Sequence, residues 1–363
     1  MSLSKVNNRI IGIDVARALA IFGMIIVNFK IVFGGEGAAW AKTLVGLFEG
    51  KAAATFVVLA GVGIALITKS AIKTKNTEKL KTTKKQIAKR ALLLFLTGIS
   101  YITIWPADIL HFYGIYMLVV LFLLQRSKRF IFLTGSTFIV LFPILMALCD
   151  YGTGWKFDTL SYQDFWTIKG FARNLFYNGF HPVIPWAAFM VFGYWLGQQD
   201  LRNTSYVKKL FSYSLITFVA AQLLSYLAIK LLSDGSQQMT KEITEILGTS
   251  PMPPLPIYMI NGVAIAFTTI SACILVGKKF ENSKSINVLS KTGQLALTFY
   301  VAHVVIGMGF IDTITPDKLG QYPVEFSIGY AVVFSILCML FAAAWLKHKK
   351  SGPLEWVFRK LIN

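Results

Sequence analysis

The chain has 363 residues, of which 55% are hydrophobic and 15% charged, and its mean hydropathy is +0.60. This composition excludes an ordinary soluble domain and is typical of a protein that crosses the membrane several times. The net charge of +19 would suggest nucleic acid in a soluble chain. Here the basic residues gather between apolar runs, so we expect the lipid bilayer, and no nucleic acid, as partner.

The apolar runs predict an all-α fold, a polytopic transmembrane helix bundle that forms a single integral membrane domain over residues 1–363. We expect ten spans near residues 10–33, 50–68, 91–105, 107–125, 130–148, 183–199, 210–233, 256–277, 293–311 and 325–346. Pro106 disfavours helix at the residue before it, so we expect the third span to end at Trp105. The first run exceeds a signal-peptide core, and we expect it to remain as a helix.

Lysine and arginine predict the orientation of these spans. Most of them fall in segments that we place inside, namely residues 1–9, 69–90, 126–129, 200–209, 278–291 and 347–363. The acidic residues show the opposite bias, and those placed inside are Glu78, Asp200, Glu281 and Glu355. The positive-inside rule therefore predicts that both termini are cytoplasmic, in a multi-pass protein of the bacterial inner membrane.

The first span carries polar residues that a passive anchor does not need. Asp14 and Arg17 are three residues apart and share one face, and Asn28 returns to that face after nearly four turns. An ionised group in a spanning helix costs about 2.5–3.5 kcal/mol on insertion scales unless it is paired or faces protein or water. We expect this stripe to face the bundle. An Asp14–Arg17 pair at the cytoplasmic interface is the alternative that the sequence leaves open.

Two segments between spans carry further signals. Residues 69–90 are expected to form a long basic loop, explained by topology and anionic headgroups, with the phosphates of a nucleotide-bearing cofactor as the alternative partner. Residues 149–181 are the longest outer loop, and their aromatic residues suit interfacial packing or a lid over a polar substrate. The cysteines lie singly in or beside apolar runs, so we expect no disulfide framework and no metal.

His111 follows Asp108 by three residues at the expected outer mouth of the fourth span. A carboxylate at this spacing can orient the imidazole and raise its basicity, as a general base requires. The alternative is structural, with Asp108 capping the helix and His111 a polar residue at the interface. The sequence leaves both open.

Two other histidines lie at or within spans. His303 is expected near the bilayer midplane, with Tyr300 on its face, and a histidine at that depth is usually functional or part of a polar network. His181 opens the sixth span, where a boundary residue is the simpler interpretation. Gly193 and Gly197 form a GxxxG pair on that span, which predicts close helix packing.

Several stretches resemble the YeiB family of bacterial membrane proteins, which is related to the heparan-α-glucosaminide N-acetyltransferases. The first is RIIGIDVARALAIFGMIIVN (residues 9–28). The others are LFEGKAAATFVVLAGVGIAL (47–66), ADILHFYGIYML (107–118), HPVIPWAAFMVFGYWLGQ (181–198), TGQLALTFYVAHVVIG (292–307) and GPLEWVFRKL (352–361). They cover most of the membrane core in the family's order.

This resemblance implies transfer of an acyl group from cytoplasmic acyl-CoA, acetyl-CoA first, to an amine or hydroxyl on the far side. The acceptor is a small molecule, a sugar or a lipid-linked group. In heparan-type enzymes a histidine of the first outer loop lies in a Glu-His-Ala-Pro-Trp context. Here the stretch reads EGAAW, so Gly37 replaces it, and His111 or His303 must supply the base. The expected cofactor-binding residues are Arg17, Asp14 and Asn28, and the expected substrate-binding residues are His181, Trp186, Tyr300, Glu36 and Trp40.

Two other functional classes stay open, as does the oligomeric state. A transporter or flippase for an anionic or lipid-linked substrate would use the same intramembrane polar groups, although the sequence shows no repeat. A non-catalytic scaffold is favoured by the lost loop histidine. No nucleotide-binding glycine loop, metal-ligand cluster or serine nucleophile elbow is visible in the sequence.

Overall fold

The computed structural model describes residues 9–233 and 235–363, which confirm an all-α fold. Within these residues the strands are limited to one hairpin, whose two strands, β1 (Trp155–Lys156) and β2 (Ser161–Tyr162), have two residues each. The chain forms two compact units. Unit 1 comprises residues 9–48, 200–213 and 267–356 of the described chain, and unit 2 comprises 49–199, 214–266 and 357–363. The expectation of one membrane domain over the whole chain stays a prediction, as does its start at residues 1–8, which lie outside the described residues.

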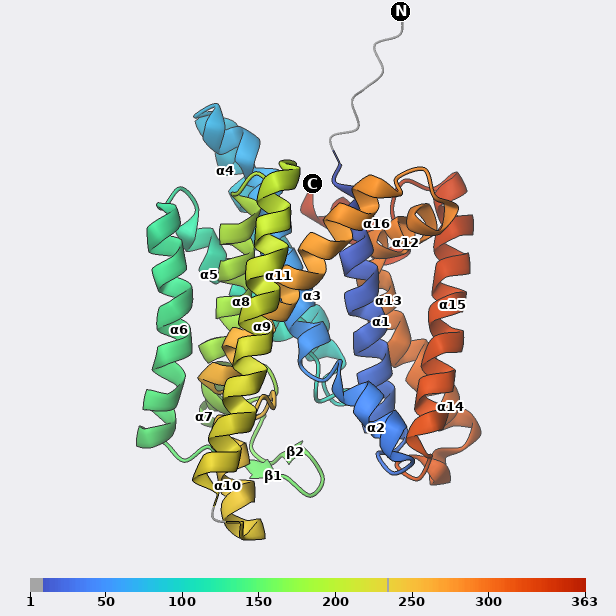
Figure 1. Cartoon of the computed structure of the whole chain (residues 1–363). Coiled ribbons are helices and arrows are strands. Elements are labelled where there is room, and N and C mark those ends of the chain that lie inside the picture. Colours follow the sequence, from blue (N-terminus) through green and yellow to red (C-terminus); the bar gives the residue numbers. More distant parts are fainter. Residues whose placement is uncertain (1–8, 234) are drawn as a thin grey trace, which may run out of the picture. The chain divides into compact units, whose positions relative to one another are not determined.

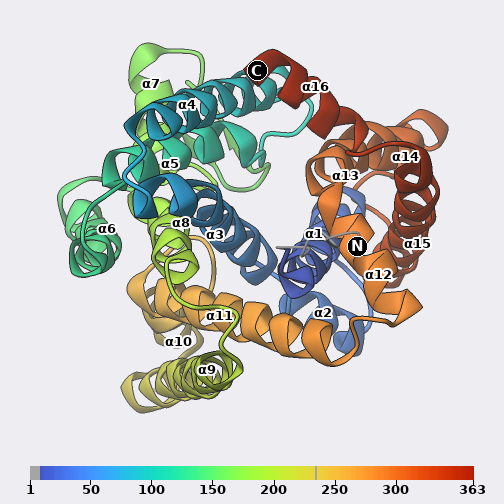
Figure 2. The same ribbon diagram turned by 90° about the horizontal axis from the view of Figure 1, so that it is seen from above.

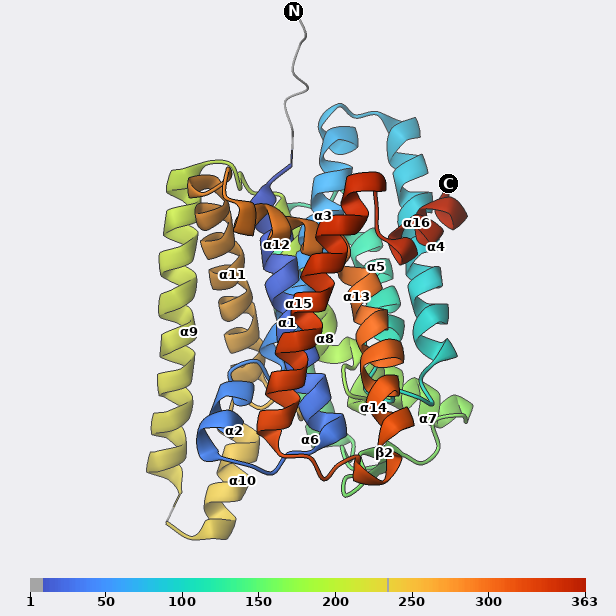
Figure 3. The ribbon, with the colours of Figure 1, turned by 90° about the vertical axis from the view of Figure 1, so that its right-hand side faces the viewer.

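Unit 1 is built around α1 (Ile11–Phe33), whose neighbours come mainly from the C-terminal third of the chain (Figure 1). The other elements are α2 (Ala39–Gly46), α12 (Lys284–Gln294), α13 (Ala296–Ala302), the π-helix η2 (His303–Met308), α14 (Gly309–Ile314), the short 3₁₀ turn η3 (Pro316–Lys318) and α15 (Val324–His348). Figure 3 shows α1 beside α15, and α12 packs against both helices.

Unit 2 is built around α8 (Val183–Gly197), which packs against α3 (Lys51–Lys73), α5 (Leu110–Leu123) and α6 (Lys128–Leu148) (Figure 2). Further elements are α4 (Thr77–Ser100), α7 (Ile168–Arg173), the π-helix η1 (Asn174–Asn178) and α10 (Gln237–Leu247). The division between the units falls within α9 (Thr204–Leu232), α11 (Pro256–Lys279) and α16 (Pro353–Ile362).

Close packing of α3 on α8 confirms the prediction from the GxxxG pair. A Cβ atom added at Gly193 would lie 2.0 Å from the carbonyl oxygen of Val58, and one added at Gly197 would lie 2.6 Å from the Cβ of Ala65. No side chain fits at such distances, so only glycine allows the two backbones to approach this closely. The same contact fixes α8, the helix that begins two residues after His181.

Seven helical stretches among the described residues are long and apolar enough, by length and composition, to cross a membrane. Two shorter apolar helices, α5 and α8, accompany them. These elements overlap nine of the expected spans, and the chain is a membrane protein with several apolar helices. The count of ten spans and the cytoplasmic termini stay predictions.

Two expectations about local structure were wrong. The third span ends at Ser100 rather than Trp105, and an irregular turn leads to α5. Residues 69–90 are not a loop, because α3 continues to Lys73 and α4 begins at Thr77, with the side chain of Asn76 accepting the Lys79 N–H as its cap. The ninth expected span, residues 293–311, overlaps the apolar helical stretch Ala296–Ile314, which consists of α13, the π-helix η2 and α14.

Candidate active site

Asp108 and His111 form a buried pair at the start of α5 in unit 2. Asp108 is fully buried and His111 is 1% exposed. One Asp108 oxygen accepts the Tyr101 hydroxyl at 2.6 Å, and the other accepts His111 Nδ1 at 3.1 Å and the His111 backbone N–H at 3.2 Å. The carboxylate therefore contacts both a backbone N–H of the first helical turn and the imidazole ring of His111. Both contacts that the sequence left open are present, and the general-base role stays a prediction.

The second ring nitrogen of His111 is Nε2. In the tautomer whose Nδ1 donates to the Asp108 carboxylate, Nε2 carries the lone pair of the ring. This buried Nε2 has no hydrogen-bond partner among the described residues. Buried polar atoms are nearly always paired, so an unpaired imidazole nitrogen indicates a place for a polar ligand or water.

Neighbouring rings extend this polar cluster within unit 2. The ring of Phe112 contacts that of His181 at 6.1 Å, and His181 meets Trp186 edge to face at 4.5 Å between centroids. Tyr116 donates its hydroxyl to the His181 carbonyl. In the described chain, His181 Nδ1 and Trp186 Nε1 are also buried without a hydrogen-bond partner. The structure thus brings four of the expected site residues into one cluster in unit 2: Asp108, His111, His181 and Trp186.

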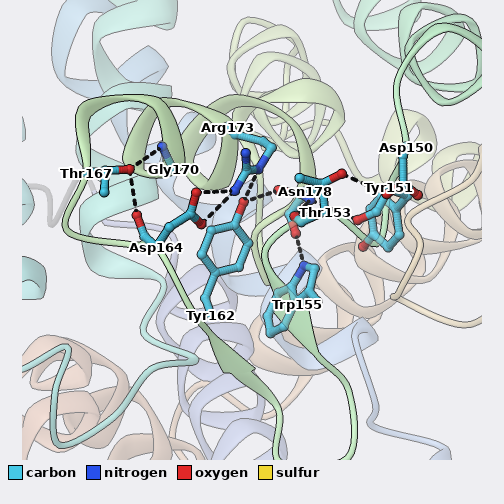
Figure 4. Close-up of polar contacts among 10 residues, drawn as sticks. All are labelled: Asp150, Tyr151, Thr153, Trp155, Tyr162, Asp164, Thr167, Gly170, Arg173 and Asn178. Carbon is cyan, nitrogen blue, oxygen red and sulfur yellow. Dashed lines mark hydrogen bonds and ion pairs between the residues drawn. The ribbon is translucent and has the colours of Figure 1, made fainter.

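The loop of residues 149–182 covers His111 and has a defined structure of its own. The ring of Phe165 packs edge-on against His111 at 6.4 Å. Figure 4 shows the polar network that holds this loop, in which Arg173 Nη2 binds both oxygens of Asp164 at 2.6 and 2.7 Å and its Nε donates to the Tyr162 hydroxyl. Burial raises the pKa of Tyr162, and the Arg173 guanidinium opposes this. The sequence did not single out Arg173 or Asp164, because the two side chains come into contact only when the loop folds back.

Two aromatic residues of this loop pack inside it rather than at an interface. Trp155 donates its indole N–H to the Asn178 carbonyl at 2.5 Å, and Tyr177 donates its hydroxyl to the Cys149 carbonyl at 2.6 Å. Both side chains are buried, whereas Trp166 is exposed. The loop is therefore a packed cap with one exposed tryptophan.

Unit 1 holds the other buried histidine, His303, at the first position of the π-helix η2. Its Nε2 lies 2.9 Å from the amide nitrogen of Asn28, and its ring contacts those of Tyr300 at 5.2 Å and Phe29 at 6.2 Å. The structure brings together Asn28, Tyr300 and His303, which the sequence assigned to different roles. Because Asn28 engages Nε2, that nitrogen is less available as a base than Nε2 of His111.

The C-terminal tail fixes the helix that leads into His303. Glu355 Oε1 accepts the backbone N–H groups of Leu297 and Thr298 at 2.9 and 3.1 Å, and Oε2 accepts the Thr298 hydroxyl at 2.6 Å. A carboxylate at a helix N-terminus satisfies donors that have no partner in the helix itself. On the far side of His303, Tyr330 donates to the carbonyl of Gly307 in the π-helix at 2.9 Å. The sequence gave no sign of this role for Glu355.

Asp14 lies between two arginines at the start of α1. Its carboxylate, 2% exposed, accepts Arg17 Nη1 at 2.7 Å and also Arg9 Nε. The side chains of Arg17 and Arg9 are 27% and 46% exposed. The acid is buried as expected, whereas the guanidinium groups stay open to an anion. The part played by Arg9 was missed, because it precedes the helix.

Glu36 and Trp40 are exposed and lie outside both histidine clusters. Glu36 accepts Lys42 Nζ at 2.7 Å, and this hydrogen bond lowers the pKa of the carboxyl. Gly37 has φ +148°, and a Cβ there would lie 2.4 Å from Glu325 Oε2. Glu325 also accepts the Ala38 N–H at 2.7 Å. The loop position that carries a histidine in heparan-type enzymes is thus shaped for glycine.

Two family models match the chain. The model described as "Heparan-alpha-glucosaminide N-acetyltransferase, catalytic" matches residues 9–231. The model described as "Protein of unknown function (DUF418)" matches residues 194–363. A search of curated proteins finds no match. Among the described residues, no three His, Cys, Asp or Glu side chains gather as metal ligands.

Proposed function

The chain belongs to the heparan-alpha-glucosaminide N-acetyltransferase catalytic family, and from this premise we propose that it is a membrane acyltransferase that uses acyl-CoA. Acetyl-CoA is the first donor to test, and the acceptor is an amine or hydroxyl on the extracytoplasmic side of the bacterial inner membrane. One observation carries the proposal within unit 2. It is a buried Asp–His pair whose Nε2 faces no partner among the described residues.

His111 acts as general base in this proposal. An acyl-CoA thioester is an activated acyl donor, so no further activation by the protein is required. As the acceptor oxygen or nitrogen bonds to the thioester carbonyl carbon, His111 Nε2 takes the proton that the hydroxyl or amine loses. The C–S bond then breaks, and the imidazolium returns this proton to the departing CoA thiolate. Asp108 holds the imidazole in the tautomer that presents Nε2 and stabilises the imidazolium that forms. Burial of the pair limits the access of bulk water, which would otherwise compete as the acceptor.

Unit 1 supplies separate proposed roles. Arg17 and Arg9 expose guanidinium groups that suit the phosphates of CoA, while Asp14 fixes their positions. Asn28 and His303 form the second candidate centre, with Tyr300 against the ring. His181 and Trp186 are proposed to contact the acceptor through their buried nitrogens.

The direct test uses purified full-length protein and two readouts, acetyl-CoA binding and CoA release in the presence of amine or hydroxyl acceptors. His111→Ala should keep donor binding and lose about 10²–10⁴ in rate, the usual contribution of a general base. His348→Ala is the matched control, because this histidine is exposed at the end of α15. If the parent protein binds no acyl-CoA, the proposal is wrong and a scaffold or transporter replaces it.

The expected sidedness has its own test in intact cells. Cys149 is exposed and lies in the segment placed outside, so a membrane-impermeant thiol reagent should label it. A Cys149→Ser, Lys81→Cys variant moves the thiol to the segment placed inside and should stay unlabelled until the cells are opened. Labelling of that variant in intact cells would reverse the orientation.

A further inference from the structure

A cleft of about 540 Å³ opens beside the cap in unit 2, apart from the His111 cluster. It is bounded by the end of α6, by α7, by η1 and by the first turn of α8. The lining residues are Leu145, Cys149, Asp150, Thr153, Lys169, Ala172, Arg173, Phe176, Tyr177 and Ile184. The charged lining residues come from α7 and from the residue pair after α6, and the large apolar ones come from α6, η1 and α8; we call these two groups the charged and the apolar side. This combination is the chemistry of an amphiphile site.

The charged side holds both cationic side chains, Lys169 and Arg173, and an anionic one, Asp150. Lys169 makes no hydrogen bond or ion pair with any described residue, so its ammonium is available. Arg173 uses Nη2 for Asp164 and Nε for Tyr162, which leaves Nη1 without an acceptor in the described chain and holds the side chain in place. Asp150 accepts the Thr153 hydroxyl at 2.7 Å and the Gly152 N–H at 3.0 Å, and the Thr153 hydrogen bond lowers the pKa of its carboxyl. Figure 4 shows Asp150 and Arg173 in this network.

The apolar side continues a surface that faces away from the protein. Leu145, Phe176 and Ile184 line the cleft, and on α6 the neighbouring Ile144 and Leu148 are 50% and 76% exposed. Exposed aliphatic side chains on a span-length apolar helix are suited to lipid chains. An acyl chain can therefore lie along α6 while its headgroup occupies the charged side.

We propose that this cleft binds a zwitterionic lipid headgroup that carries a phosphate and a primary ammonium, as in phosphatidylethanolamine. The phosphate meets Lys169 Nζ and Arg173 Nη1, and the ammonium meets the Asp150 carboxylate. A purely anionic headgroup leaves Asp150 facing a negative charge, and a choline group lacks the N–H donors that a carboxylate binds best. The site does not depend on acyl transfer, since none of its residues belongs to the His111 or His303 clusters.

Cys149 makes the site measurable in the full-length protein. Its thiol lies at the cleft wall and is exposed, whereas Cys273 and Cys338 are buried. The experiment follows alkylation of Cys149 by intact mass in detergent micelles that contain short-chain phosphatidylethanolamine, phosphatidylglycerol or phosphatidylcholine. Phosphatidylethanolamine should slow alkylation at the lowest lipid fraction. The Cys149→Ser variant should show no alkylation, which verifies that the measured mass shift comes from Cys149.

Exposed variants test the headgroup contacts without threatening the fold. Lys169→Ala should weaken protection about tenfold, the value of one charge-assisted hydrogen bond. Lys156→Ala, an exposed lysine of the same loop outside the cleft, should leave it unchanged. Asp150→Asn should abolish the preference for phosphatidylethanolamine over phosphatidylglycerol. Equal protection by all three lipids, or unchanged protection in Lys169→Ala, would overturn the proposal, whatever the outcome of the acetyl-CoA assays.

Discussion

Each unit of this protein holds a fully buried histidine, His111 in unit 2 and His303 in unit 1, and the two differ in what holds the ring. In unit 2 a carboxylate orients His111 through Nδ1 and leaves Nε2 without a partner among the described residues. In unit 1 an amide engages Nε2 of His303, and aromatic rings pack around it. Both rings are buried, so the hydrogen-bond partner of each ring determines which one is better suited to accept a proton. A carboxylate stabilises the imidazolium that a base becomes, whereas a neutral amide cannot offset that charge.

The surroundings of the two histidines differ as well. His111 lies beneath a cap fastened by Arg173 and Asp164, next to His181 and Trp186 with their own unpaired nitrogens. His303 sits at the start of a π-helix, fixed by Tyr330 beyond it and by Glu355 before it. π-Helices often occur at functional sites, so His303 stays the second candidate centre. In the proposed mechanism, proton transfer therefore falls to His111 of unit 2, and His303 of unit 1 has a positioning or binding role.

The largest effect short of removing the base is expected for Asp108→Asn. The amide keeps the shape but offers no charge to the imidazolium, so transfer should fall by a factor of about 10–10³. If Asp108 acts through His111, the double variant Asp108→Asn, His111→Ala should be no slower than His111→Ala. The measurement is CoA release at saturating acetyl-CoA. A double variant that is much slower would give Asp108 a role of its own.

His303→Ala should affect folding more than turnover. It deletes a buried ring packed against Phe29 and Tyr300 and leaves Asn28 without this partner, at a cost of about 2–3 kcal/mol. The midpoint of thermal unfolding in detergent should fall relative to the parent and to His348→Ala. An unchanged midpoint together with lost transfer would move the chemistry to unit 1.

Removing Asp14 should be worse than removing it together with Arg17. Asp14→Ala leaves two guanidinium groups facing each other, and we expect a cost of about 1–3 kcal/mol because both arginines keep some contact with solvent. Asp14→Ala, Arg17→Ala should recover part of that loss in thermal midpoint. Equal, parent-like midpoints in the single and double variants would show that the pair contributes nothing to the fold.

Glu355→Gln is the smallest perturbation in the comparison. The amide can still accept from the Leu297 and Thr298 backbone, but the charge-assisted part of these hydrogen bonds is lost, at about 1 kcal/mol. Hydrogen exchange of the first amides of α13 should rise, while Lys360→Gln, on the same tail, should leave it unchanged. Unaltered exchange would mean that the tail does not secure the helix before His303.

Much of the fold could be predicted from hydropathy alone, because bilayer thickness sets helix length and apolar runs of that length are unambiguous. The runs that became α1, α3 and α15 began within a residue or two of their predicted positions. The prediction was wrong for a segment that is not purely apolar. Residues 69–90 were expected to be a loop because they are basic, yet lysine is a good helix former, and the helices continue to Lys73 and resume at Thr77.

The site was predictable where partners are close in sequence and missed where they are distant. Asp108 and His111 are three residues apart, so their contact followed from helical spacing. The Glu355–Thr298 and Arg173–Asp164 contacts depend on a tail and a loop that fold back, and no local period signals them. The Gly37 substitution was visible in the sequence, but only the structure shows Glu325 beside it.

The most direct test of the difference between the two histidines is a single-turnover comparison of His111→Ala and His303→Ala. Both variants are loaded with acetyl-CoA under conditions in which binding is verified, and CoA release is then followed with acceptor present. We predict that His111→Ala loses about 10²–10⁴ in rate while His303→Ala stays within about tenfold of the parent. Normal turnover by His111→Ala alongside loss in His303→Ala would contradict the assignment of the base to unit 2.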